Sequence, residues 1–129
     1  MLLTKKKKGY FLYVPVECLR DEKPITFKIR TLTNIELAEF EDMEEVVDMD
    51  SGEVINKVAE VEIKIAKACI SGWKNIKSGS KGIPYKGDVE ALEPYDSYFL
   101  LREVGQYIKA ISKDPNMESE LMRIREELK

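Results

Sequence analysis

Pairs of adjacent carboxylates, among them Glu41-Asp42, Glu44-Glu45 and Glu126-Glu127, are the residues of this chain best suited to acid–base chemistry. A glycosidase-type pair must flank a cleft at a defined separation, with burial raising one of its two pKa values. Adjacent acids in helix-forming, highly charged surroundings are more typical of a solvated face. Histidine is absent, which removes the commonest general base near neutral pH and the commonest transition-metal ligand. We therefore expect a non-enzymatic protein without catalytic residues, cofactor or metal.

Two loops share features with ligand-binding motifs but lack the required order. Asp48 and Asp50 precede Gly52, yet an EF-hand needs glycine at loop position six and glutamate at position twelve, where this chain has Ala59. The run 78–82 is rich in glycine and serine, but a Walker loop needs Gly-Lys-Ser/Thr between a buried strand and a helix. Both segments are predicted to be turns.

Cys18 and Cys69 are the two cysteines, and both lie in apolar surroundings. Two buried free thiols are the prediction for a reducing compartment, with a disulfide as the alternative. The apolar patch 1–4 precedes four lysines, which reverses the order of a secretory signal, and no apolar run approaches the ~18 residues of a membrane span. A cytoplasmic protein is therefore expected.

Charge is distributed unevenly along the 129 residues. Residues 1–30 contain eight Lys or Arg against three acids, a balance of +5, whereas residues 33–56 contain nine acids and no Lys or Arg. Such blocks form two solvated faces, or they steer a basic partner or a second copy of the chain. The length suits one domain, which we place at 10–113, between a flexible basic segment 1–9 and an amphipathic helix in 114–129.

Alternating apolar and polar residues predict a β-hairpin over about 12–31, with strands at 10–14, 16–20 and 25–30 around a turn at Asp21–Pro24. Thr33 and Glu36 form a capping box, so a helix should begin at Asn34 and run to about Val47. Its narrow apolar stripe comprises Leu37, Phe40, Met43 and Val47.

A second helix is predicted from about Glu53 to Ser71, with Gly72 as a left-handed C-cap, and its apolar residues make it the central core helix. A third helix should begin with Pro94 in its first turn and end near Ser112. The last should span about 116–128. The predicted fold is α+β, mainly α, with an N-terminal β-hairpin followed by about four helices around the central apolar helix.

The final helix places apolar residues at a spacing typical of a seam between helices. These residues are Met117, Leu121, Ile124 and Leu128. The stripe packs on its own domain or docks on a partner, and the sequence leaves both alternatives open. Trp73 and Tyr85 favour the interpretation of packed loop anchors over exposed hot spots.

The order of motifs resembles that of a known family. An Arg/Lys-rich second strand (27–30) precedes Leu32-Thr33 and an acidic helix, and a long apolar helix then ends in Gly72-Trp73-Lys74-Asn75. Next come Gly82-Ile83-Pro84-Tyr85 and a Leu92-x-Pro94 helix start. This pattern resembles the small tail assembly chaperones of long-tailed (siphovirus-like) bacteriophages and prophages, over about residues 10–113.

The resemblance implies a non-catalytic protein of the bacterial host cytoplasm that binds the tape measure protein until tail tube subunits displace it, and that can form a homo-oligomer. The contact residues expected on this basis are Glu36, Glu39, Phe40, Met43, Trp73, Met117, Leu121, Ile124 and Leu128. A minor tail or head–tail connector protein is the alternative. A small nucleic-acid-binding regulatory module, using Lys5–Lys8 on phosphates, is the second alternative.

Overall fold

A three-stranded antiparallel sheet forms one side of the fold. The computed structural model describes residues 10–114 and 116–128, so the prediction for segment 1–9 lies outside the described residues. The strands, in sheet order, are β1 (Tyr10–Tyr13), β2 (Thr26–Arg30) and β5 (Ile70–Lys74). Phe27 and Ile29 of β2 are fully buried, whereas Lys28 between them is exposed. The pairing of β1 with β2 confirms the predicted hairpin.

The connection from β1 to β2 differs from the prediction. Residues 16–20 were expected to continue as a strand, but Val16–Cys18 form a single 3₁₀ turn. Pro15 precedes this turn and lacks the N–H that a strand pairing would use. Cys18 is therefore half-buried rather than buried, and both Cys18 and the buried Cys69 are free thiols.

Strand β5 was missed by the sequence analysis. Helix α2 (Val58–Cys69) ends before Ser71, and Ile70 is already extended as the chain pairs with β2. Gly72 lies within this strand, so its prediction as a left-handed helix cap is wrong. The physical reason is non-local: β2 has two edges, and the pairing of Phe27 with Trp73 supplies the second ladder.

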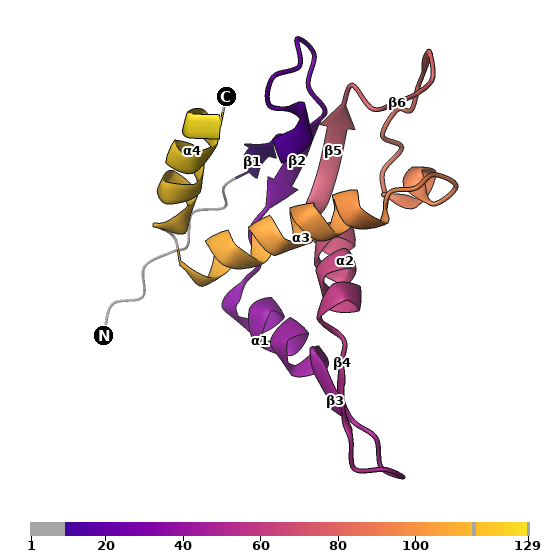
Figure 1. Cartoon of the computed structure of the whole chain (residues 1–129), viewed down its shortest axis with the longest axis vertical. Coiled ribbons are helices and arrows are strands. Elements are labelled where there is room, and N and C mark those ends of the chain that lie inside the picture. The colour runs from indigo at the N-terminus through magenta and orange to yellow at the C-terminus, as the bar shows by residue number, and fades with distance from the viewer. Residues whose placement is uncertain (1–9, 115, 129) are drawn as a thin grey trace.

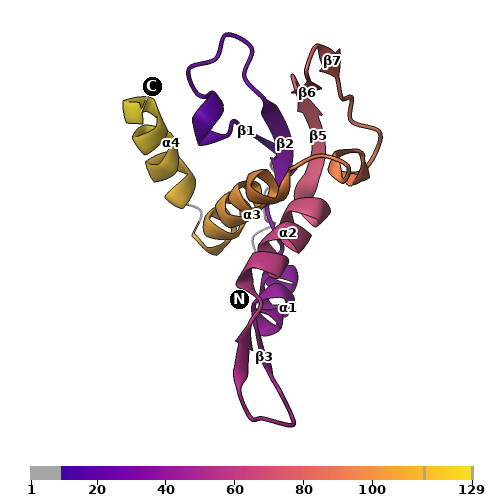
Figure 2. The ribbon, with the colours of Figure 1, turned by 45° about the vertical axis from the view of Figure 1, so that its right-hand side comes forward.

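A second hairpin replaces the expected ends of two helices. Helix α1 (Asn34–Met43) stops short of Val47, and β3 (Glu45–Val47) pairs with β4 (Val54–Asn56). Both strands are exposed along their whole length. Their β-branched residues favour strands, and the predicted turn at 48–52 joins them, with Gly52 at φ +72°. Figures 1 and 2 show this hairpin projecting from the end of the molecule. We call residues 45–56 the acidic arm.

The remaining helices pack around the sheet and one another (Figures 1 and 2). Helix α3 (Tyr98–Lys113) begins after Ser97, so the predicted start at Pro94 is wrong; a 3₁₀ turn at Glu90–Leu92 occupies the preceding segment. Helix α4 (Met117–Leu128) matches its predicted range. The core contains Phe27, Ile29, Leu32, Ile65, Val104 and Ile108. The chain is α+β, as predicted.

Helices α2 and α3 cross at very close range because α3 contains a glycine at the crossing. A Cβ atom built on Gly105 would lie 1.9 Å from the backbone oxygen of Glu62. The same crossing carries an ion pair, in which Arg102 Nη2 donates to Glu62 Oε1 at 3.2 Å. The Glu62 side chain is only 4% exposed, so this contact ties the two helices together inside the fold.

A short hairpin lies at the opposite end of the molecule from the acidic arm (Figures 1 and 2). Strands β6 (Lys77–Ser78) and β7 (Lys81–Gly82) pair around a turn in which Gly79 has φ +62°. This turn is the segment that the sequence analysis compared with a phosphate loop. The segment 74–86, exposed at most of its positions, contains four lysines and no acid. We call it the basic loop.

Candidate interaction surfaces

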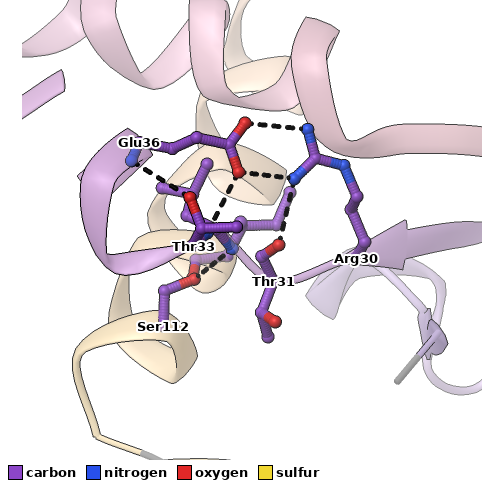
Figure 3. A network of polar contacts seen from close by, with 7 residues as sticks. Arg30, Thr31, Thr33, Glu36 and Ser112 are labelled. Atoms are coloured by element: carbon purple, nitrogen blue, oxygen red, sulfur yellow. Dashed lines mark hydrogen bonds and ion pairs between the residues drawn. The ribbon is translucent and has the colours of Figure 1, made fainter. Parts of the chain in front are cut away.

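Glu36 is engaged within the chain (Figure 3). Arg30 donates two hydrogen bonds to its carboxylate, Nη1 to Oε1 at 2.9 Å and Nη2 to Oε2 at 3.0 Å. The predicted capping box is confirmed: the Thr33 N–H donates to Glu36 Oε1 at 3.0 Å, and the Glu36 N–H donates to Thr33 Oγ1 at 3.2 Å. The bonds from Arg30 and Thr33 lower the pKa of Glu36 to about 2. Glu36 therefore anchors the start of α1.

The other predicted contact residues of α1 do not share one face. Phe40 is half-buried against the core, whereas Glu39 and Met43 are exposed. Two further acids of this segment are paired with α3: Lys113 donates to Glu41 at 2.9 Å, and Lys109 donates to Glu44. The Lys113 ammonium lowers the pKa of Glu41. Much of the acidic helix is thus tied to the body of the protein.

Trp73 is a packing anchor in the sheet. Its indole Nε1–H donates to the carbonyl oxygen of Ile83 at 2.8 Å, and its ring meets Tyr85 edge-on at 4.9 Å between centroids. A second edge contact joins Trp73 to Phe27 at 6.3 Å. The chain around it forms a groove of about 440 Å³, lined by Trp73, Lys74, Asn75, Ile76, Lys77, Gly82, Ile83 and Pro84. We call this the Trp73 groove.

Helix α4 packs on its own domain, which is the first of the two alternatives that the sequence left open for its apolar stripe. Leu121 packs against the core, and one turn later Arg125 lies over the ring of Tyr13 at 4.5 Å from its centroid. Met117 is half-buried and Ile124 is 44% exposed. The side chain of Leu128 lies outside the described residues. The described docked face therefore contains Leu121, which belongs to the predicted stripe, and Arg125, which does not.

Tyr13 connects this contact to α3. Its hydroxyl donates to Glu103 Oε2 at 2.5 Å, and the backbone N–H of Val16 donates to the same oxygen at 3.1 Å. Burial raises the pKa of Tyr13, and the adjacent Glu103 carboxylate raises it further. The neutral phenol thus remains a hydrogen-bond donor while Arg125 rests on its ring. These contacts fix α4 beside β1 at the sheet edge.

Between α4 and β1 lies an apolar groove of about 460 Å³. Tyr10 and Leu12 of β1 are 64% and 67% exposed at this site, and Met122 of α4 is 55% exposed. The other lining residues are Phe11, Val14, Leu19, Pro24, Tyr107, Arg125 and Glu126. We call this the β1–α4 groove. No prediction from the sequence included this groove, although one signal was present. Residues 10–14 are hydrophobic at every position, so Tyr10 and Leu12 form an exposed hydrophobic face while Phe11 and Tyr13 face the core.

A third groove, between α2 and α3, contains the ion pair between buried Glu62 and half-buried Arg102. Lys109 and Lys113 also line it, but both are paired with acids of the α1 segment. Among residues 10–114 and 116–128, no three metal-ligating side chains gather in one place. No helix within that range is long and apolar enough to cross a membrane.

Comparison with known proteins identifies no relative. No family model matches the chain, and neither a curated protein nor a solved structure matches it.

Proposed function

We propose that this chain is a tail assembly chaperone of a long-tailed bacteriophage or prophage. It binds an apolar segment of the tape measure protein in the host cytoplasm and releases it to tail tube subunits, without catalysing a reaction. The observation that carries the proposal is the β1–α4 groove, where Tyr10, Leu12 and Met122 remain exposed beside a completed core.

The shape and chemistry of this groove suit a helix or an extended apolar segment. Amphipathic helices bind by placing apolar side chains in a groove of this type, and methionine adapts to different apolar surfaces. The tyrosine and leucine of β1 supply one wall, and Met122 supplies the other. Such contacts are individually weak, so several copies along one tape measure protein would hold it by multivalency and still be displaced.

Co-expression with the tape measure protein of the same phage or prophage tests the proposal. The wild-type chain should keep that protein soluble and co-purify with it. Leu12→Asp and Met122→Asp should each abolish this effect, because a carboxylate in the groove opposes burial of apolar partner surface. Phe99→Asp is the matched control: Phe99 is 74% exposed on α3 and does not line the groove, so this variant should behave as wild type.

Purified tail tube protein should then release the chaperone from the complex. If both groove variants keep the tape measure protein as soluble as the wild type does, the groove is not the binding site. If the wild type itself fails to keep it soluble, the chaperone function is wrong.

A structural tail component is the second candidate, and the projecting acidic arm favours it. An exposed hairpin that extends from the body of a small domain is well placed to contact a neighbouring subunit (Figure 1). Quantitative mass spectrometry of purified particles separates the two candidates. A structural component is present in fixed number per tail, whereas a chaperone is absent from finished tails.

A further inference from the structure

The basic loop gathers hydrogen-bond donors on one exposed hairpin. Its lysines are Lys74, Lys77, Lys81 and Lys86, and none forms an ion pair within the residues that the structure describes. Ser78 and Ser80, at the tip of the hairpin, add two exposed hydroxyls. The next acid along the chain is Asp88, so all charged side chains between 74 and 86 are cations. Lysine and serine side chains are donors that proteins use to bind nucleic-acid phosphates.

An apolar recess opens beside two of these lysines. Lys74 and Lys77 line the Trp73 groove, and the other lining residues include the indole ring, Ile83 and Pro84. The indole is held in place, because its Nε1–H donates to the carbonyl oxygen of Ile83 at 2.8 Å and its ring meets Tyr85 edge-on. A fixed aromatic ring beside a row of cations is the arrangement on which proteins stack unpaired bases.

Asn75 shapes this recess from the backbone. Its φ is +64°, a left-handed conformation that is uncommon for non-glycine residues, and it lies where the chain passes from β5 to β6. Its side-chain amide donates to the carbonyl oxygen of Pro24 at 3.0 Å, which fixes the bend against the neighbouring turn. Backbone in such a conformation is found preferentially at ligand-binding sites. The adjoining residues 20–23 contain two cations and two acids, so they do not offset the positive charge of the loop.

The net charge of −3 does not oppose an anionic ligand at this end of the molecule. The acidic arm projects from the opposite end (Figures 1 and 2). Helix α2 joins the arm to β5, and its 12 residues, at about 1.5 Å each, make it about 18 Å long. Exposed charges interact weakly beyond the Debye length, which is about 8 Å at physiological ionic strength. The carboxylates of the arm are therefore largely screened from a ligand on the basic loop.

We propose that the basic loop and the Trp73 groove together bind single-stranded nucleic acid. Backbone phosphates contact the four lysines, and one unpaired base enters the groove and packs against the indole ring. Duplex nucleic acid binds more weakly, because its bases are already paired and stacked. The site reads no particular sequence, since its donors meet phosphates rather than base edges. This binding uses neither the β1–α4 groove nor the tape measure protein, so it is independent of the proposed function.

Trp73 is the single tryptophan of the chain, so its fluorescence reports on this groove alone. Titration with an oligodeoxythymidylate of about 12 nucleotides, at about 0.05 M salt, should quench this fluorescence as a base packs on the ring. An oligonucleotide made only of abasic sites, with the same number of phosphates, should bind about tenfold or more weakly and leave the fluorescence unchanged. A duplex of the same length should also fail to quench it.

A second variant separates the basic loop from the lysines near the N-terminus. Its substitutions are Lys5→Gln, Lys6→Gln, Lys7→Gln and Lys8→Gln. This variant should still show the quenching, and its binding should depend on salt through the loop alone. The slope of log affinity against log salt concentration should be about −3, since each of four phosphate contacts on a single strand contributes about −0.7. Adding Lys81→Gln should make the slope shallower by about 0.7.

Removal of all four loop lysines tests the phosphate contacts against a matched control. The loop variant carries Lys74→Gln, Lys77→Gln, Lys81→Gln and Lys86→Gln, and it should lose both the binding and the quenching. The control removes four exposed cations from α2, α3 and α4 and should bind as the wild type does. Its substitutions are Lys64→Gln, Lys67→Gln, Lys113→Gln and Arg123→Gln. Circular dichroism checks that both variants fold.

Poly-glutamate with the same number of charges tests whether the site prefers an acidic protein segment. It should bind about tenfold or more weakly than the oligonucleotide, because it has no base to place on the indole ring. Equal or tighter binding of poly-glutamate overturns the proposal. So does unchanged Trp73 fluorescence with the oligodeoxythymidylate, equal affinity for the abasic oligonucleotide, or a loop variant that binds as tightly as the control.

Discussion

The crossing of α2 and α3 at Gly105 makes the most quantitative prediction. In Gly105→Ala, the new methyl carbon would lie 1.9 Å from the Glu62 carbonyl oxygen and 2.7 Å from its carbon, where ordinary contact begins near 3.4 Å. The obstructing atoms are backbone, so the helices must separate by on the order of 1.5 Å rather than rotate a side chain. Gaps of 0.5–1 Å already forfeit about a quarter to a half of the dispersion energy of the atoms involved. The buried residues Val61, Ile65 and Ile108 would all lose contacts.

The expected loss in free energy of unfolding is about 2 kcal/mol. Overpacking lowers the free energy of unfolding by about 1–3 kcal/mol, and by more where the backbone must move. The higher helix propensity of alanine offsets roughly 1 kcal/mol of this loss. Urea unfolding followed by circular dichroism should show a midpoint lower by roughly 1 M, given an m-value of about 2 kcal/mol per M. Gly72→Ala is the matched control, because its Cβ would meet only Lys28 Cβ at 3.7 Å. A Gly105→Ala protein as stable as the wild type would refute the close crossing.

Three further predictions concern single side chains. Glu36→Gln should lower the free energy of unfolding by about 1 kcal/mol at neutral pH, because it weakens a partly exposed ion pair and a helix cap. The pKa of Glu36 is lowered from 4.5 to about 2, so the difference from wild type in urea unfolding should persist above pH 4.5 and vanish as the pH falls through 2. Arg125→Ala removes the contact with Tyr13, worth about 1 kcal/mol, and should speed proteolysis within α4; unchanged cleavage would contradict the docking. Burial raises the pKa of the Cys69 thiol to about 11, so iodoacetamide should label half-buried Cys18 first, and Cys18→Ser should leave the native protein nearly unlabelled.

Predictions from local sequence succeeded where the interacting residues are neighbours in the chain. The Thr33–Glu36 capping box, the turn at 48–52 and the range of α4 all depend on groups within about one helical turn or one β-turn. The alternation of 25–30 likewise identified β2. These signals need no knowledge of the tertiary fold.

The errors lie where distant segments compete for the same residues. Residues 45–47 and 54–56 have apolar side chains that fit a helical stripe, but they pair with each other as strands. Ile70 and Ser71 were predicted to end a helix capped by Gly72, yet the open edge of β2 takes Ile70–Lys74 into the sheet. In both cases a strand partner outweighs local helix propensity, which is a weak preference of less than about 1 kcal/mol per residue.

For the candidate surfaces too, some properties follow from local sequence and others from the tertiary fold. The sequence by itself determined the separation of charge, with acids gathered in 33–56, because charge is a property of residue type. It also favoured a packing role for Trp73, although Trp73 was among the contact residues expected from the resemblance too, and the structure shows its packing contacts with Ile83 and Tyr85. Only the tertiary structure decided that α4 docks through Leu121 and Arg125, that β1 and α4 enclose an apolar groove, and that the acidic arm and the basic loop lie at opposite ends. The reason is geometric: each of these surfaces joins residues far apart in the chain, and their juxtaposition depends on the α2–α3 crossing and on the pairing of β5 with β2.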